Sequence, residues 1–158
     1  MTIMNTSQPT VTFTMGLPAA GKSTWVKANL PSDFVVDPDA IKANHDDYDP
    51  KDPAALHTWS KTVAAAQFAT CLATGDNFVL DGTGTKAEAL IQNVRTAATA
   101  GFTTRLVYVT CSLATSLKRN AARARVVPEN VIREKSETIA IAFELISREV
   151  DQIQVVNN

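Results

Sequence analysis

Short apolar runs alternate with longer amphipathic stretches along most of the chain. Four runs have the pattern of strands, VTFTM at 11–15, FVVD at 34–37, NFVLD at 77–81 and RLVYVT at 105–110, and a weaker one covers 153–156. Their near-continuous Val, Leu and Phe content is typical of parallel strands covered by helices on both faces.

Helix start and stop signals occupy the segments between these runs. They predict helices from Asp52-Pro53 to Thr74, from a capping box at Thr85 and Glu88 to near 101, from 112 onward and from 128 to about 150. This alternation predicts an α/β doubly wound parallel sheet of about five strands. We expect a flexible tail at 1–9 and a single domain at 10–158.

Composition narrows the class of protein. A chain of 158 residues and 45% hydrophobic content buries enough surface to fold without disulfides or metals. Its 15 Lys and Arg nearly balance 16 Asp and Glu, which argues against a wholly electrostatic nucleic-acid binder. No apolar stretch is long enough for a membrane span, and no secretory signal precedes the first strand. Because Cys71 and Cys111 form no ligand or disulfide pattern, we expect a cytoplasmic protein.

The strongest chemical signal is GLPAAGKS at 16–23, which follows the first predicted strand and opens a helix. Such a G-x-x-x-x-G-K-S loop holds nucleotide phosphates on backbone N–H groups, with the lysine on the β- and γ-phosphates and the serine on Mg²⁺. The predicted ATP-binding residues of this loop are Gly16, Ala19, Ala20, Gly21, Lys22, Ser23 and Thr24.

The rest of the sequence favours one class of nucleotide-binding protein. The D-x-x-G and N-K-x-D motifs of switch GTPases are absent, and the third strand ends in a lone Asp81 where a motor or AAA-type ATPase carries an hhhhDE motif. A compact ATP-dependent phosphotransferase remains, although a regulatory protein that binds nucleotide without turnover is the alternative from another class.

Candidate acceptor-side residues follow the second and third strands, whose carboxyl ends lie beside the phosphate loop in such sheets. Asp39 is a candidate general base for a hydroxyl, with Lys42 on the same helix face for an acceptor anion. A helix-capping role for Asp39 is the plain alternative. Asp81 is a candidate Mg²⁺ ligand together with Ser23. We expect Asp37, Lys42, Asp81 and Thr83 to contact substrate.

A basic segment follows the fourth strand. Residues 118–125 contain Lys118, Arg119, Arg123 and Arg125 and no acid, whereas 33–52 contain seven aspartates and two lysines. Arginines that cover the phosphates neutralise the charge that develops on the γ-phosphoryl group. We therefore predict a lid made by Arg119, Arg123 and Arg125, against the plain alternative of a solvated basic face.

The motifs GLPAAGKSTW, VDPDAIK, LDGTGT and KRNAARARVVPENVI, in this order, resemble the kinase domain of phage polynucleotide kinases and the wider group of zeta-toxin-like small kinases. The resemblance covers about residues 10–150. It implies Asp39 as general base, Lys22 and Arg123 as catalytic residues on the transferred phosphate, and Lys42 at the place of an arginine that grips the acceptor's phosphate.

The resemblance implies ATP and Mg²⁺ as cofactors and a kinase that phosphorylates a hydroxyl on nucleic acid. That acceptor is the 5′-OH of a polynucleotide or a hydroxymethylated pyrimidine such as 5-hydroxymethyluracil in DNA. A zeta-toxin-like kinase of a nucleotide-sugar or nucleoside remains the alternative within the class.

Overall fold

The computed structural model describes residues 7–52 and 54–158. In chain order, the elements are β1 Thr10–Met15, α1 Lys22–Asn29, β2 Phe34–Val36, α2 Pro38–Ala43, α3 His57–Thr74, β3 Phe78–Leu80, α4 Ala87–Thr99, β4 Thr103–Thr110, α5 Leu113–Ala122, α6 Glu129–Ser147 and β5 Gln152–Asn157.

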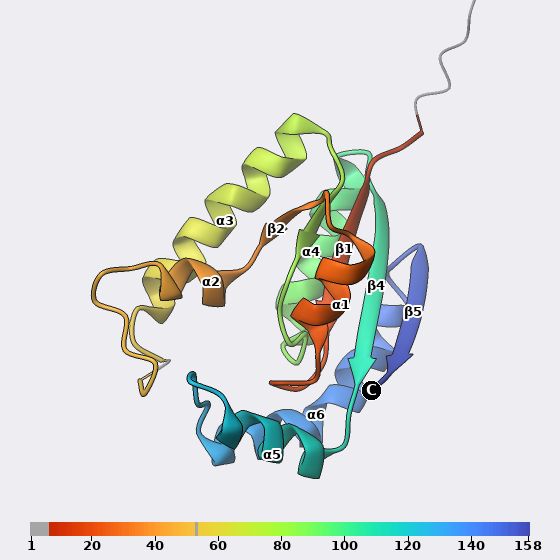
Figure 1. Ribbon diagram of the computed structural model, residues 1–158. Helices are drawn as coiled ribbons and strands as arrows, with labels where there is room; N and C mark the ends of the chain where they lie inside the picture. The colour runs from red at the N-terminus through yellow and green to blue at the C-terminus, as the bar shows by residue number, and fades with distance from the viewer. Residues whose placement is uncertain (1–6, 53) are drawn as a thin grey trace, which may run out of the picture.

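All five strands form one parallel sheet in the order β2-β3-β1-β4-β5. Leu80 of β3 pairs with both Val36 of β2 and Phe13 of β1, so these three strands end at the same edge of the sheet. In Figure 1 this carboxyl edge points downward, and α5 and the start of α6 lie below it. The loops that carry the predicted chemistry therefore converge at this edge.

The sheet is covered on both faces. Val11, Phe13 and Met15 of β1 are fully buried in the larger core cluster, which includes residues of α3, α4 and α6. The neighbouring positions Val107 and Val109 of β4 belong to a smaller cluster on the other face, with Trp25 of α1 packed against it. Figure 1 shows α1 in front of the sheet and α4 and α6 behind it.

The structure confirms the predicted fold class, and every predicted strand is present within one or two residues of its expected bounds. Ser112 also caps α5 as expected, because its hydroxyl accepts a hydrogen bond from the Thr115 N–H at 3.1 Å. Residues 1–6 of the predicted tail lie outside the described residues. Beyond them, the Pro9 carbonyl accepts a 2.8 Å bond from the Thr103 N–H, next to the first residue of β1.

Two predicted helix starts are wrong. Helix α3 begins at His57 rather than at the Asp52-Pro53 signal, and residue 53 lies outside the described residues. Helix α4 begins at Ala87 without a side-chain cap, so the predicted capping box at Thr85 does not form. The Thr85 hydroxyl instead lies 3.2 Å from that of Thr83, in the turn before the helix.

Candidate active site

The phosphate loop is a tight backbone structure between β1 and α1. Gly16 has φ +155° and a Cβ there would lie 2.5 Å from the Val109 carbonyl oxygen, so a larger residue does not fit. Gly21 has φ +104°, a conformation that L side chains rarely adopt, and it stands at the N-cap of α1. No side chain caps α1. The first N–H groups of the helix therefore have no side-chain partner and are suited to an anion.

Lys22 folds back over this loop. Its ammonium donates hydrogen bonds of 2.9 Å to the carbonyls of Gly16 and Leu17. Burial lowers the pKa of Lys22 to about 8, against the opposing effect of the carboxylates of Asp81 and Asp39. An ammonium that has lost water and bonds only neutral carbonyls is stabilised strongly by an anionic partner, which a nucleotide phosphate provides. Ser23 and Thr24 are exposed at the start of α1.

Helix α5 is docked directly on the loop. The buried hydroxyl of Ser116 donates a 2.6 Å hydrogen bond to the Pro18 carbonyl. Arg119, on the same helix, extends its guanidinium to 3.4 Å from the Ala20 carbonyl. Arg119 therefore lies beside the predicted phosphate-binding backbone, as its predicted role requires.

The other two lid arginines lie beyond the end of α5. The four-residue spacing of Arg119 and Arg123 predicts one shared helix face, but Arg123 is the C-cap of α5 with extended backbone, so that prediction is wrong. The buried amide of Asn120 fixes the loop that follows, because it accepts from Val127 N–H at 3.0 Å and donates to the Val127 carbonyl at 2.8 Å. Arg123 also donates to Asn120 at 3.1 Å, while its buried Nε has no hydrogen-bond partner among the described residues.

Arg125 reaches across to the candidate base. Its guanidinium lies 2.6 Å from the carboxylate of Asp39 on α2, whose side chain is 57% exposed. Partial burial raises the pKa of Asp39, but the hydrogen bond and charge of Arg125, with Lys42 and Lys22, hold it below its ordinary value. Asp39 is therefore ionised at neutral pH. The structure therefore brings the arginine segment and the candidate base together.

The carboxylates of Asp37 and Asp81 follow directly after the paired residues Val36 and Leu80 at adjacent strand ends. Burial and the nearby Asp81 raise the pKa of Asp37 to about 6. Asp37, not Asp39, is the N-cap of α2, because its carboxylate accepts from the N–H groups of Asp39 and Ala40 at 2.9 and 3.2 Å. The capping alternative for Asp39 is therefore wrong.

Asp81 is held by a residue that the sequence analysis overlooked. The Thr14 hydroxyl of β1 donates to a carboxylate oxygen of Asp81 and accepts a 3.0 Å bond from the Gly82 N–H. Thr14 is 2% exposed and Asp81 is 9% exposed, so the pair is shielded from water. The signal was present in the alternation of VTFTM, which puts Thr12 and Thr14 together on one face of β1.

The remaining substrate-side candidates lie on the same edge. Lys42 is buried in α2, at 4% exposure, although long cationic side chains rarely are. Thr83 links its turn to the phosphate loop, since its carbonyl accepts a 3.0 Å bond from the Gly16 N–H. Asp37, Asp81 and Thr83 therefore lie at the strand-end edge that also carries the phosphate loop, whereas Lys42 is buried in α2.

The oxygen ligands at this edge suit Mg²⁺, which needs only one or two protein ligands, better than a metal ion coordinated entirely by protein side chains. Among residues 7–52 and 54–158, no three His, Cys, Asp or Glu side chains are grouped to hold a metal ion. Mg²⁺ in nucleotide sites takes one or two protein ligands and completes its shell with water and phosphate oxygens. The crowded pair of Asp37 and Asp81, whose repulsion a cation would relieve, and the exposed hydroxyl of Ser23 fit that requirement.

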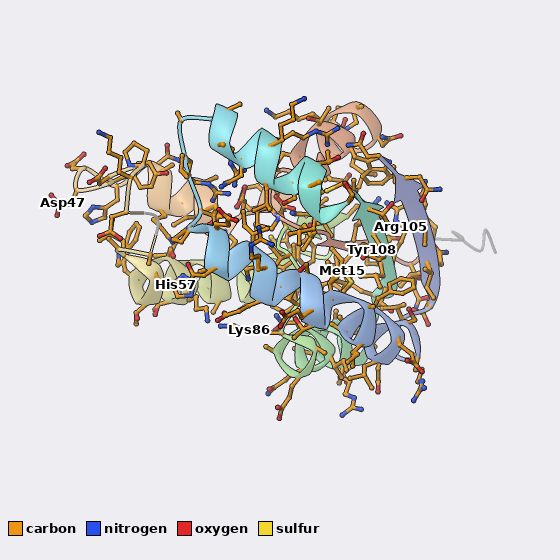
Figure 2. All side chains as sticks on the ribbon, turned by 90° about the horizontal axis from the view of Figure 1, so that it is seen from below. Met15, Asp47, His57, Lys86, Arg105 and Tyr108 are labelled. Carbon is orange, nitrogen blue, oxygen red and sulfur yellow. The ribbon has the colours of Figure 1, made fainter. Side chains whose placement is uncertain are left out.

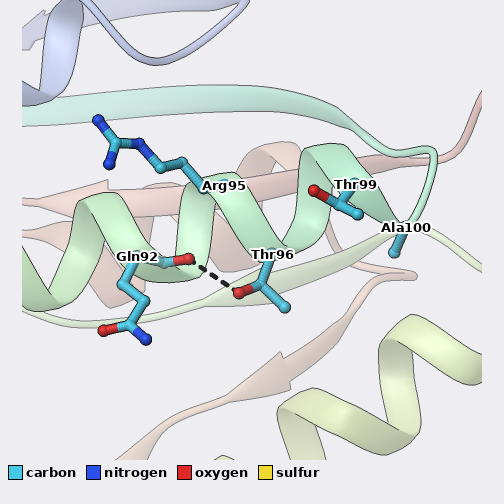
Figure 3. Close-up of a pocket in the computed structure, with 5 residues that line it drawn as sticks. All are labelled: Gln92, Arg95, Thr96, Thr99 and Ala100. Atoms are coloured by element: carbon cyan, nitrogen blue, oxygen red, sulfur yellow. Dashed lines mark hydrogen bonds between the residues drawn. The ribbon is translucent and has the colours of Figure 1, made fainter.

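A shallow hollow elsewhere on the surface carries no such chemistry. It measures about 400 Å³ on the outer side of α4 and is lined by Gln92, Arg95, Thr96, Thr99 and Ala100 (Figure 3). Thr96 there bonds the Gln92 carbonyl at 2.9 Å, and Arg95 pairs with Glu149 at 2.7 Å. The candidate active site is the convergent edge and not this hollow. None of the helices in the described ranges is long and apolar enough to cross a bilayer.

Sequence comparison supports this assignment of the loop. A family described as an AAA domain matches residues 11–146, which include the phosphate loop, both candidate carboxylates and the arginine segment. We set aside motors and AAA-type ATPases because the third strand ends in a lone Asp81, and the matching family nevertheless carries the description of an AAA domain. No curated protein matches the chain closely enough to count as a relative.

Solved structures share the fold at low sequence identity. The complex of AvrRxo1-ORF1 and -ORF2 with ATP has a TM-score of 0.75 at 17% identity, over 97% of this chain and 55% of that one. The PezAT toxin–antitoxin system of Streptococcus pneumoniae has a TM-score of 0.72 at 14% sequence identity, and the match covers 97% of this chain and 70% of that one. The Pnkp1/Rnl/Hen1 RNA repair complex has a TM-score of 0.71 at 17% sequence identity, and the match covers 91% of this chain and 48% of that one.

These likenesses establish a P-loop kinase-like fold. This chain spans little more than half the length of the AvrRxo1 protein that it matches.

Proposed function

We propose that this chain, which belongs to the AAA domain family, is an ATP-dependent kinase that transfers the γ-phosphate of ATP to a hydroxyl on nucleic acid. The observation that carries the proposal is the convergence of a nucleotide-type phosphate loop, an ionised carboxylate at Asp39 and three arginines on one edge of the sheet. A protein that only binds nucleotide has no need of a carboxylate placed beside the phosphates.

The chain's residues have separable roles in this reaction. The loop from Gly16 to Thr24 binds the phosphates of ATP through backbone N–H groups, and Lys22 exchanges its carbonyl partners for the β- and γ-phosphate oxygens. Arg119, Arg123 and Arg125 balance the charge on the transferred group and exclude water. Magnesium, when bound, neutralises phosphate charge, and Ser23 and Asp81 would hold it, with Asp81 oriented by Thr14.

Phosphoryl transfer releases the proton of the acceptor hydroxyl, and Asp39 is the group that accepts it. The acceptor oxygen forms a bond to the γ-phosphorus while the bond from that phosphorus to the β–γ bridging oxygen breaks, and ADP leaves. Asp39 orients the hydroxyl and takes its proton. Asp37, Lys42 and Thr83 contact the acceptor. We place the active domain at residues 10–158, in a reducing cytoplasm that suits the free thiols of Cys71 and Cys111.

A panel of acceptors with ³²P-labelled ATP tests the proposal. The panel contains 5′-OH DNA, 5′-OH RNA, a duplex with hydroxymethyluracil, and UDP-sugars. Transfer to one of the first three is expected, whereas transfer to UDP-sugars alone would select the zeta-toxin-like alternative. ATP binding without transfer to any acceptor would select the regulatory alternative.

Two variants assign the roles. Asp39→Asn should lower kcat by about 10²- to 10⁴-fold without weakening ATP binding. Lys22→Ala should weaken ATP binding itself. Full transfer by the Asp39→Asn protein would show that Asp39 is not the base.

A further inference from the structure

A group of basic side chains lies beside the candidate active site, separate from the lid arginines. It comprises His57 and Lys61 one turn apart on α3, Lys86 at the start of α4, and Lys135 on α6. Figure 2 looks at the carboxyl edge and shows His57 and Lys86 on the same flank of it, beside α3 and α6. None of these residues belongs to the phosphate loop or to the arginine segment. We call this group the lysine cluster.

The cluster is held together by specific contacts. The Lys135 ammonium lies 3.4 Å from the Thr85 hydroxyl and 3.5 Å from the Thr83 hydroxyl, so α6 is joined to the turn that follows β3. Lys86 follows Thr85 directly in the chain. Since Thr83 also bonds the phosphate loop through its carbonyl, the cluster is linked to the loop by one short turn.

The charges in the cluster repel one another. The positive charge of Lys86, followed by burial, lowers the pKa of Lys61. Burial, followed by the charge of Lys86, lowers the pKa of Lys135, and burial with the charges of Lys42, Lys61 and Lys86 lowers that of His57. The opposing acidic groups that face these residues are Asp39 and, for Lys135, also Glu134.

The three lysines of the cluster have no ion-pair partner among the described residues. Among residues 7–52 and 54–158, Lys61, Lys86 and Lys135 make no ion pair, although Arg95, Arg125, Arg133 and Arg148 all do. Fixing like charges together costs free energy, and a bound anion would recover it. Lys135 contacts the hydroxyl of Thr83, whose carbonyl bonds the phosphate loop, so an anion bound here would lie near the candidate active site.

We propose that Lys61, Lys86 and Lys135, with His57, form a binding site for a phosphate group of the acceptor. The proposal rests on the proposed function, since it places the acceptor where the hydroxyl faces Asp39. It assigns the lysines to the acceptor and the arginines to ATP. The ligand is a phosphate next to the reacting hydroxyl, whether in a strand or in a single nucleotide.

Direct binding tests the site without catalysis. The probe is a 5′-OH oligodeoxynucleotide labelled with fluorescein at its 3′ end, and its anisotropy is measured without ATP over a range of KCl concentrations. The double variant Lys61→Gln/Lys86→Gln should raise the Kd about tenfold. It should also reduce the slope of log K against log salt by about 1 to 2, because two phosphate contacts are lost.

The matched control is Lys27→Gln/Arg148→Gln, which removes the same charge from exposed positions near the ends of α1 and α6. It should leave the Kd within about twofold. Competition against the labelled strand by thymidine 3′-monophosphate, UDP-N-acetylglucosamine and thymidine identifies the source of the phosphate. Thymidine alone should not compete.

The outcomes separate the inference from the proposed function. Equal binding by wild type and the lysine variant, or failure of wild type to bind any phosphate-bearing probe, overturns the inference even if the kinase is active. A selective loss of binding in the lysine variant supports it even if no acceptor is phosphorylated. With an active kinase, the variant should raise KM for the acceptor and leave KM for ATP unchanged.

Discussion

Arg125 and Asp39 are separated by 86 positions in the chain and are joined by a 2.6 Å ion pair across the candidate active site. The guanidinium belongs to the segment after α5 and the carboxylate to α2, so the pair connects the arginine segment to the acceptor side. Asp39 is the proposed base and Arg125 a proposed ATP contact. Binding of ATP and acceptor therefore requires this pair to exchange partners, which couples the lid to the base.

Arg125→Ala should raise the pKa of Asp39, because the hydrogen bond and positive charge that hold it low are removed. The melting temperature should stay within about 3 °C of wild type, since an ion pair with an exposed carboxylate contributes at most about 1 kcal/mol. Carboxyl ¹³C NMR titration measures the pKa. Arg133→Ala, which breaks the surface pair with Glu129 at 2.6 Å, is the control and should not move it. An unchanged Asp39 pKa in Arg125→Ala would contradict the geometry.

Lys22→Met should weaken ATP binding by at least about 100-fold, because a phosphate oxygen loses a charged donor. The free energy of unfolding should be unchanged or higher, since the methionine buries no ammonium where wild type does. Isothermal titration calorimetry and urea unfolding give the two quantities. A variant that loses stability and ATP binding together would show that Lys22 is structural.

The phosphate loop and the strand ends were predictable because each depends on residues close in sequence. The G-x-x-x-x-G-K-S motif determines the backbone conformation of the loop that it forms, and an apolar run followed by Asp locates a strand end. The pairing of Asp39 with Arg125 was not predictable, since it depends on where α5 ends. That end is fixed by contacts of Asn120 with Val127, which no local pattern marks.

The wrong predictions have local physical causes. The capping box at Thr85 failed because the turn after β3 uses that hydroxyl for contacts with Thr83 and Lys135. The helical spacing of Trp59 also predicts that it faces the core, yet it is 42% exposed and packs edge-on against His45 with ring centroids 4.6 Å apart. A periodicity identifies a face of a helix but not which turns of that face meet the sheet.

Thr14→Val should lower the free energy of unfolding by about 1 to 3 kcal/mol. Valine keeps the size of the side chain but removes the hydroxyl, so the buried Asp81 carboxylate and the Gly82 N–H each lose a hydrogen-bond partner. It should also raise the concentration of Mg²⁺ needed for tight ATP binding, since Asp81 is no longer oriented. Thr14→Ser keeps the hydroxyl and should restore both properties. If Thr14→Val lowers stability but leaves the Mg²⁺ dependence unchanged, Asp81 is not a metal ligand.

Asp37→Asn should remove a pH-dependent loss of stability. The pKa of Asp37 is raised from 3.8 to about 6 in the folded protein, so between these values the folded state binds more protons than the unfolded state. Stability from this group is present below about pH 4 and is lost as pH rises through about 6. Asparagine keeps the cap on α2, since its carbonyl oxygen accepts the same N–H bonds, but carries no charge beside Asp81.

The advantage of Asp37→Asn over wild type should therefore grow from pH 4 to 6 and level off above pH 7, at about 1 to 2 kcal/mol after solvent screening. Urea unfolding at each pH without added magnesium measures it. Asp76→Asn, at an exposed position between α3 and β3, should give a curve parallel to wild type. Parallel curves for Asp37→Asn as well would mean that neither burial nor the charge of Asp81 raises the pKa of Asp37. Added Mg²⁺ should reduce the advantage, because a cation between the two carboxylates relieves the same repulsion that asparagine removes.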